Sequence, residues 1–490
     1  MKKIIITASI LLLFATACTS DDPSYNDNKD RAYDVAAETL LANAQRELAD
    51  QSTTPEVNLN PFRFYTQYWA STQYPEESQY NVVTRNISNN LWNNLYRDVL
   101  GNLESAKDII EENEDIDAGT KQNQLAIIEV LKVYTFQLLV DTFGDVPYTD
   151  ALDPLNVLPR YDDDAAIYPA LITRLDAAIA NLNEASGTFT TGDVLLNGDI
   201  SRWIVFGNSL KVKLGIALAD VNPALAQSTI ESAVANGVIL TNEQNVTFNY
   251  SPTAPVTNPI FAQIVSSGRN DYVGSETIIS ALSQLDDPRI GRYFQTVDDD
   301  DDNDTPEVYI GGVNGDANDY FSFSPPGELF EEAALPGVII EATEINFYLA
   351  EAAARGYNVG GSAEEYYNAA ITTSFEYWEV TGNDNELIDA YLAQPDVAYS
   401  TAPGDWKQKI GTQAWIAFYN RPFESWNEWR RLDVPSLTPA ANAVPAANGQ
   451  IPVRLTYPIN EQTVNNANWQ AASSAIGGNT LNTKVFWDVD

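Results

Sequence analysis

The sequence contains no histidine, and Cys18 and Met1 are its single cysteine and single methionine. The absence of histidine excludes the Ser-His-Asp and Cys-His forms of nucleophilic catalysis. It also removes the ligand on which most zinc and copper sites depend, and one cysteine cannot replace it. Chemistry based on carboxylates remains open, including calcium or magnesium bound by oxygen ligands.

Basic residues are also scarce. The chain has 27 Lys and Arg against 68 Asp and Glu, which gives a formal charge of −41. Such a charge repels phosphate backbones and argues against nucleic-acid binding. Aromatic residues are plentiful, with 10 Trp, 25 Tyr and 18 Phe. Most should pack in the core, and the surplus is compatible with a surface that binds sugars or peptides by stacking.

The N-terminus has the pattern of a bacterial lipoprotein precursor. Lys2 and Lys3 precede a short apolar run from Ile4 to Phe14, and the small residues Ala15–Ala17 lead directly to Cys18. A basic start, a short apolar stretch and a small-residue cleavage site are typical of a secretory signal. We therefore predict a signal peptide over 1–17, an acylated Cys18 with a flexible tether over 18–30, and one domain over 31–490. The alternative is an ordinary signal peptide with an incidental cysteine.

Helical periodicity dominates the rest of the chain. The segment Gln124–Phe143 is apolar on nearly every face, which predicts a helix buried in a large core and ended by Gly144. Thr343–Arg355 and Ala363–Val380 predict two closely packed helices joined by a glycine-rich turn, in the manner of a degenerate tetratricopeptide repeat. Long irregular stretches interrupt the helices, and such stretches are often functional; they cover 51–85, 244–275, 294–340 and 435–470.

Several short motifs occur in a characteristic order. They are Asn60–Trp69, Asp141–Tyr148, Trp203–Lys213, Leu349–Ala353, Trp426–Arg431 and Phe486–Asp488. Together they resemble the SusD/RagB family of nutrient-binding outer-membrane lipoproteins, over essentially the whole chain after the signal peptide. The acidic pair Asp21-Asp22 likewise resembles the export tag of surface lipoproteins in the Bacteroidetes, although a solvated linker is the alternative.

The resemblance implies a mainly α-helical, SusD-like fold of tetratricopeptide-repeat-like helix pairs with long irregular ligand-binding loops. It implies no catalysis. It also implies a lipid-anchored outer-membrane protein, facing the exterior, that captures oligosaccharides or peptides and passes them to a SusC-like TonB-dependent barrel.

Two of these motifs are better explained by packing than by ligand binding. Gly144 and Pro147 end a helix, because glycine favours the helix exit and proline restricts the residue before it. Trp426, Trp429 and Arg430 share one helix face, which favours core packing with arginine–carboxylate pairs.

Candidate ligand-binding residues lie in three loop stretches that combine aromatic rings with hydrogen-bonding groups. For each stretch, anchoring of the loop to the helical core is the alternative. The candidates are Tyr74, Glu76, Tyr80 and Asn81 in the first stretch, Arg269, Asn270, Asp271 and Tyr272 in the second, and Tyr320 and Phe321 in the third. Because Pro75 disfavours a helix, we expect Tyr80 to present a free stacking face whose loss weakens binding without loss of stability.

An acidic run could bind calcium. Its candidate ligands are Asp298, Asp300, Asp302 and Asp304, since alternate carboxylates suit a hard cation with many oxygen ligands. The run lacks the glycine and distal glutamate of an EF-hand loop, and a solvated acidic turn is the alternative.

Two other classes of function stay open. A surface glycoside hydrolase would need two carboxyls roughly 5–9 Å apart in an aromatic cleft, one of them with a raised pKa. A helical-repeat scaffold that binds other proteins would carry its largest apolar patch on the repeats rather than on the loops.

Overall fold

The predicted buried helix is α6, Ala118–Phe143, in the computed structural model, which describes residues 35–297, 307–380 and 385–489. Asp117 caps its N-terminus by accepting hydrogen bonds from the backbone N–H groups of Gly119 (3.1 Å) and Thr120 (3.0 Å). Gly144 caps its C-terminus with a φ of 75°, a conformation that glycine adopts without strain. Most of its side chains from Asn123 onward are buried, so the prediction from the sequence is confirmed.

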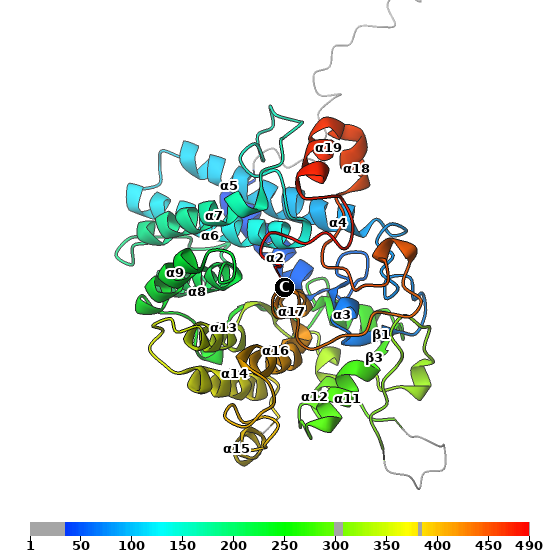
Figure 1. Cartoon of the computed structure of the whole chain (residues 1–490). Helices are drawn as coiled ribbons and strands as arrows, with labels where there is room; N and C mark the ends of the chain where they lie inside the picture. Colours follow the sequence, from blue (N-terminus) through cyan, green and yellow to red (C-terminus); the bar gives the residue numbers. More distant parts are fainter. Residues whose placement is uncertain (1–34, 298–306, 381–384, 490) are drawn as a thin grey trace, which may run out of the picture. The chain divides into compact units, whose positions relative to one another are not determined.

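Helices pack against one another in successive pairs, as the tetratricopeptide-like pattern implied (Figure 1). The paired helices are α2 (Ala37–Thr53) with α5 (Gly101–Glu112), α6 with α7 (Asp164–Asn181), α8 (Ile200–Ala217) with α9 (Pro223–Ala235), and α13 (Ala342–Ala354) with α14 (Ala363–Tyr377). Contacts of α5 with α6, α7 with α8, and α8 with α13 join the pairs into one array. The mainly helical, repeat-like fold is therefore confirmed within the unit formed by residues 37–490.

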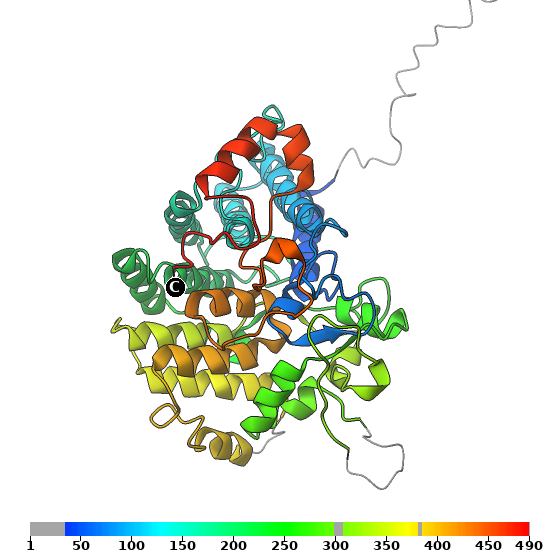
Figure 2. The ribbon, with the colours of Figure 1, turned by 45° about the vertical axis from the view of Figure 1, so that its right-hand side comes forward.

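Two further helices extend this array. α16 (Trp406–Ala417) packs on α13, and α17 (Pro422–Leu432) packs on α16. Figure 2 shows α13 and α14 in yellow running alongside α16 in brown. None of the helices in the described ranges has an apolar stretch long enough to span a bilayer.

The helix over Ile87–Glu112 is continuous but not uniform. It begins as α4 (Ile87–Asn93), widens into a π-helical segment at Asn94–Leu100, and continues as α5. The π segment shifts the helix register, a change that apolar periodicity alone does not predict.

Short elements lie within the irregular stretches and in the connections beside them. The short helices are α3 (Phe62–Tyr65), α10 (Pro259–Phe261), α11 (Glu276–Gln284), α12 (Ile290–Tyr293), α15 (Glu386–Leu392), α18 (Ile459–Val464) and α19 (Asn466–Ala475). The strands are β1 (Trp69–Ser71), β2 (Val246–Phe248), β3 (Tyr272–Gly274) and β4 (Gly337–Ile340). β1 pairs antiparallel with β3, so that Ser71 lies opposite Tyr272, and β2 pairs antiparallel with β4.

The two motifs attributed to packing do meet in the core. Trp426 is fully buried, and the guanidinium carbon of Arg430 lies 3.4 Å from the centre of its ring. The Arg430 Nη1 donates to the backbone oxygens of Asp141 (2.9 Å) and Val453 (2.8 Å). Burial lowers the pKa of Arg430 to about 10. These motifs therefore join the C-terminal segment to α6, and the prediction of core packing is confirmed. The arginine–carboxylate pairs are made by the neighbouring Arg431, which pairs with Glu351 and Glu428.

Candidate functional site

The pairing of β1 with β3 brings the three candidate loop stretches to one edge of the fold (Figure 1). Just after β1, the Thr72 N–H donates to the Asp271 backbone oxygen (3.0 Å), and the Thr72 hydroxyl donates to that of Asn270. The Asn318 N–H donates to the Ser71 backbone oxygen (2.9 Å). Segments about 200 residues apart in sequence are therefore fixed beside each other by backbone hydrogen bonds.

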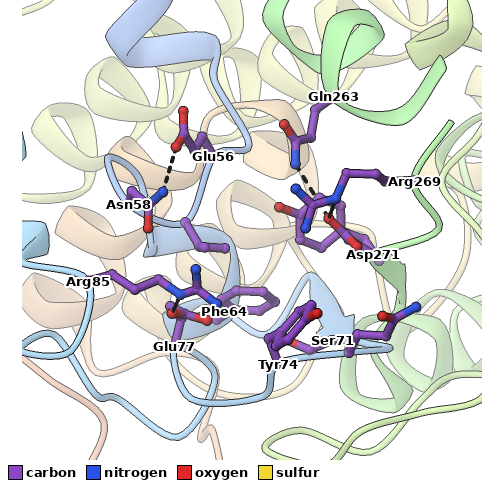
Figure 3. A pocket seen from close by; sticks show the side chains of 13 residues that line it. Glu56, Asn58, Phe64, Ser71, Tyr74, Glu77, Arg85, Gln263, Arg269 and Asp271 are labelled. Atoms are coloured by element: carbon purple, nitrogen blue, oxygen red, sulfur yellow. Dashed lines mark hydrogen bonds and ion pairs between the residues drawn. The ribbon is translucent and has the colours of Figure 1, made fainter. Parts of the chain in front are cut away.

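A cavity of about 170 Å³, here called the β1–β3 cavity, opens between the first and second stretches. Figure 3 shows the side chains that line it. They include Glu56, Asn58, Phe64, Tyr74, Glu77, Arg85, Gln263, Arg269, Asp271 and Tyr272. Most of the lining residues are polar, and Phe64, Tyr74 and Tyr272 supply aromatic rings among them, so the cavity suits a ligand that combines many polar groups with an apolar face.

Ion pairs fix two sides of this cavity. Glu77 is buried and pairs with Arg85, and the Arg269 Nε lies 2.8 Å from the Asp271 Oδ2. The Gln263 amide also donates to the Asp271 Oδ2 (3.4 Å). Burial raises the pKa of Glu77, and the Arg85 charge opposes that increase. The remaining N–H groups of the two arginines face a partly exposed cavity, where they can donate to a polar ligand.

The aromatic residues of the cavity differ in accessibility. Tyr74 is 55% exposed, and the Arg85 guanidinium carbon lies 5.7 Å from its ring centre. Tyr272 is buried, stacks on Trp69 with ring centroids 5.0 Å apart, and donates its hydroxyl to the Pro55 backbone oxygen (2.9 Å). Tyr74 is therefore the ring that can stack on a ligand, and Tyr272 forms part of the wall.

Tyr80 contradicts the expectation of a free stacking face. Only 1% of its surface is exposed, and its ring packs edge-on against Tyr65 with centroids 5.7 Å apart. Its hydroxyl accepts a hydrogen bond from the Ala440 N–H (3.0 Å). The chain after Pro75 folds into a compact turn, closed by the Gln79 N–H donating to the Pro75 oxygen (2.9 Å), and this turn directs Tyr80 inward.

The other candidates do not line the cavity. The Asn81 Oδ1 accepts from the N–H groups of Val83 (3.2 Å) and Thr84 (3.1 Å), so Asn81 stabilises a turn. Glu76 is half-buried, and Asn270 contributes its backbone oxygen to Thr72. Tyr320 and Phe321 form a separate aromatic pair with centroids 5.4 Å apart, in which Phe321 is 79% exposed.

Sequence reasoning missed several lining residues: Glu56, Asn58, Phe64, Glu77, Arg85 and Gln263. Phe64 lies within a motif that carried the family resemblance, but nothing in its spacing indicated a cavity. The others are ordinary polar residues in irregular segments, and only tertiary contacts bring them to the cavity.

The predicted calcium ligands Asp298, Asp300, Asp302 and Asp304 lie outside the described residues. A different acidic group is formed by Asp145, Asp163 and Asp164, whose carboxylate oxygens lie within 4.8 Å of one another. Its hydrogen bonds give it a structural role. Asp163 caps α7 by accepting from the Ala165 N–H (3.0 Å), the Asp145 Oδ1 accepts from the Asp164 N–H (3.1 Å), and the Asp164 Oδ2 accepts from the Phe486 N–H (3.0 Å).

Comparison with known proteins identifies the family of the chain. Residues 28–458 match the family model SusD-like_2, described as "Starch-binding associating with outer membrane". No curated protein matches the chain.

Solved structures agree with this family. A chitin-binding protein is 27% identical, with 93% of this chain and 100% of that one covered and a TM-score of 0.79. A chitin-binding SusD homologue from Flavobacterium johnsoniae is 25% identical, with 92% of this chain and 99% of that one covered and a TM-score of 0.78. A SusD homologue from Bacteroides thetaiotaomicron is 25% identical, with 93% of this chain and 99% of that one covered and a TM-score of 0.76. The chain therefore belongs to the SusD-like family of starch-binding proteins that associate with the outer membrane, a family of binding proteins rather than enzymes.

Proposed function

We propose that this protein binds an oligosaccharide in the β1–β3 cavity and passes it to a SusC-like TonB-dependent barrel in the outer membrane. The observation that carries the proposal is the position of Tyr74, an exposed ring at the mouth of a cavity lined with polar groups. Pyranose rings stack on aromatic faces, and their hydroxyls pair with fixed donors such as Arg85 and Arg269. Two similar structures are named as chitin-binding, which favours a glycan over a peptide.

The test compares binding of chitin and starch oligosaccharides with that of peptides by titration calorimetry, using wild type and Tyr74→Ala. Loss of one stacking aromatic from a binding hot spot costs about 2 kcal/mol, or about 30-fold in affinity. Leu155→Ala is the control, because Leu155 is 92% exposed and lies outside the cavity. Unchanged glycan affinity of Tyr74→Ala would contradict the assignment, and a loss confined to Phe321→Ala would transfer the site to the third stretch.

Attachment to the membrane is a second part of the proposal. Acylation of Cys18 would anchor the protein through the tether over 18–30, as its position after Ala15–Ala17 indicates. Cys18→Ser should lose incorporation of labelled palmitate and shift the protein from the membrane fraction to the soluble fraction. Retention of Cys18→Ser in the membrane would contradict the lipid anchor.

Partnership with a transporter rests on the family alone. Purification of the tagged protein from its native membrane should recover a large β-barrel protein in stoichiometric amount. A helical-repeat scaffold for other proteins would instead carry its exposed apolar residues on the helix pairs. Of the described residues, the two most exposed large apolar side chains are Leu155 and Phe321. Leu155 lies on the connection between α6 and α7, and Phe321 lies in the third loop stretch, so neither is on a helix pair, which does not favour the scaffold.

A further inference from the structure

The ionised side chains of the β1–β3 cavity do not balance. Three carboxylates line it, those of Glu56, Glu77 and Asp271, against two guanidinium groups, those of Arg85 and Arg269. Arg85 is paired with Glu77, and Arg269 is paired with Asp271. Among the described residues, Glu56 has no cationic partner within ion-pair distance, so the cavity carries one uncompensated negative charge.

Local hydrogen bonds hold Glu56 at the rim. It follows α2 and Pro55, and its backbone oxygen accepts from the N–H groups of Leu59 (2.9 Å) and Asn60 (2.9 Å). The Asn58 amide donates to the Glu56 Oε1 (2.6 Å). Figure 3 shows Glu56 and Asn58 on one side of the cavity and Tyr74 on another. The carboxylate is therefore fixed through one oxygen, and its half-buried side chain can accept a further donor through the other.

We propose that the β1–β3 cavity selects an amino sugar, with a protonated primary amine of the oligosaccharide bound by Glu56 while a neighbouring pyranose ring stacks on Tyr74. This proposal rests on the proposed function, since it specifies the glycan that the same cavity takes. An ammonium group supplies the positive charge and the hydrogen-bond donors that Glu56 lacks. A neutral N-acetyl group supplies a single weaker donor.

The surroundings of Tyr272 show how the negative charges converge. Burial raises the pKa of Tyr272 and the Asp271 carboxylate raises it further; the Arg269 charge opposes this increase, and the carboxylates of Glu56 and Glu77 add to it. These acids therefore share one small region of the cavity wall. The formal charge of −41 on the whole chain also attracts a cationic glycan toward the surface, and this attraction weakens with added salt.

The experiment compares two probes of equal length that differ only in acetylation: the chitin tetrasaccharide and its fully deacetylated counterpart, chitosan tetrasaccharide. Titrations are run at about pH 6, where the amines are protonated, with the full chain and with Glu56→Gln. We expect wild type to bind the chitosan probe about fivefold more tightly, as one partly exposed ion pair allows. Glu56→Gln should lose that preference while its affinity for the chitin probe stays the same.

Glu184→Gln is the matched control, because it removes the same formal charge from an exposed position outside the cavity. A preference retained in Glu184→Gln and lost in Glu56→Gln supports the proposal. Equal loss in both variants would attribute the preference to the overall charge and overturn it. Equal binding of the two probes by wild type would overturn it while leaving the proposed function intact, whereas failure to bind any glycan would overturn both.

Discussion

Tyr80 offers the sharpest test of the described loop structure. Replacing Tyr80 with alanine should destabilise the protein, because its ring is 99% removed from solvent and packs against Tyr65. Truncation of a buried aromatic side chain to alanine costs about 3–5 kcal/mol. The same change also leaves the Ala440 N–H without its acceptor, and an unsatisfied buried donor costs about 1–3 kcal/mol.

Tyr80→Phe separates the two contributions. It keeps the ring and removes only the hydroxyl that accepts from the Ala440 N–H, so it should lower the free energy of unfolding by about 1–3 kcal/mol. Tyr74→Ala is the surface counterpart. Since Tyr74 is 55% exposed, this change should alter the free energy of unfolding by less than about 0.5 kcal/mol while weakening glycan binding.

Urea denaturation followed by tryptophan fluorescence measures these differences, and calorimetry of glycan binding accompanies it. The structure requires the order of destabilisation to be Tyr80→Ala, then Tyr80→Phe, then Tyr74→Ala. Suppose that Tyr80→Ala unfolds at the wild-type urea concentration but loses glycan affinity. Tyr80 would then be a surface residue, and the inward direction of the turn after Pro75 would be refuted.

Two further predictions concern stability. Burial raises the pKa of Asp164 to about 7, so the stabilisation from its bound proton is complete below about pH 4 and is lost as pH rises through 7. Asp164→Asn should therefore stabilise the protein by about 2 kcal/mol more at about pH 8 than at about pH 5, as measured by urea denaturation; an equal effect at both pH values would contradict this titration. Asn318 donates through Nδ2 to the Ser71 oxygen (2.9 Å) and accepts from the Val313 N–H (2.8 Å), so Asn318→Ala should cost about 2–3 kcal/mol. The exposed Asn460→Ala, far from this loop in sequence, is its control and should cost less than about 0.5 kcal/mol, and equal costs would show that Asn318 does not anchor the third stretch.

The sequence predicted the helical array well because helix formation depends on neighbours three and four residues apart. The prediction over Gln124–Phe143, with its end at Gly144, corresponds to α6. The predicted pair over 343–355 and 363–380 corresponds to α13 and α14. The order of short motifs was enough to indicate the family. The Trp426–Arg431 segment was predicted to pack in the core, because its large residues recur on one helix face.

The β1–β3 cavity depended on tertiary structure. Glu56, Arg85 and Arg269 lie in irregular segments where no periodicity relates one residue to the next, and strand pairing between β1 and β3 brings them together. The direction of Tyr80 was decided by the segment around Ala440, 360 residues away in sequence, which covers the ring and donates to its hydroxyl. Local sequence thus determined the helices and their core faces. The accessibility of each loop side chain followed only from which distant segment covers it.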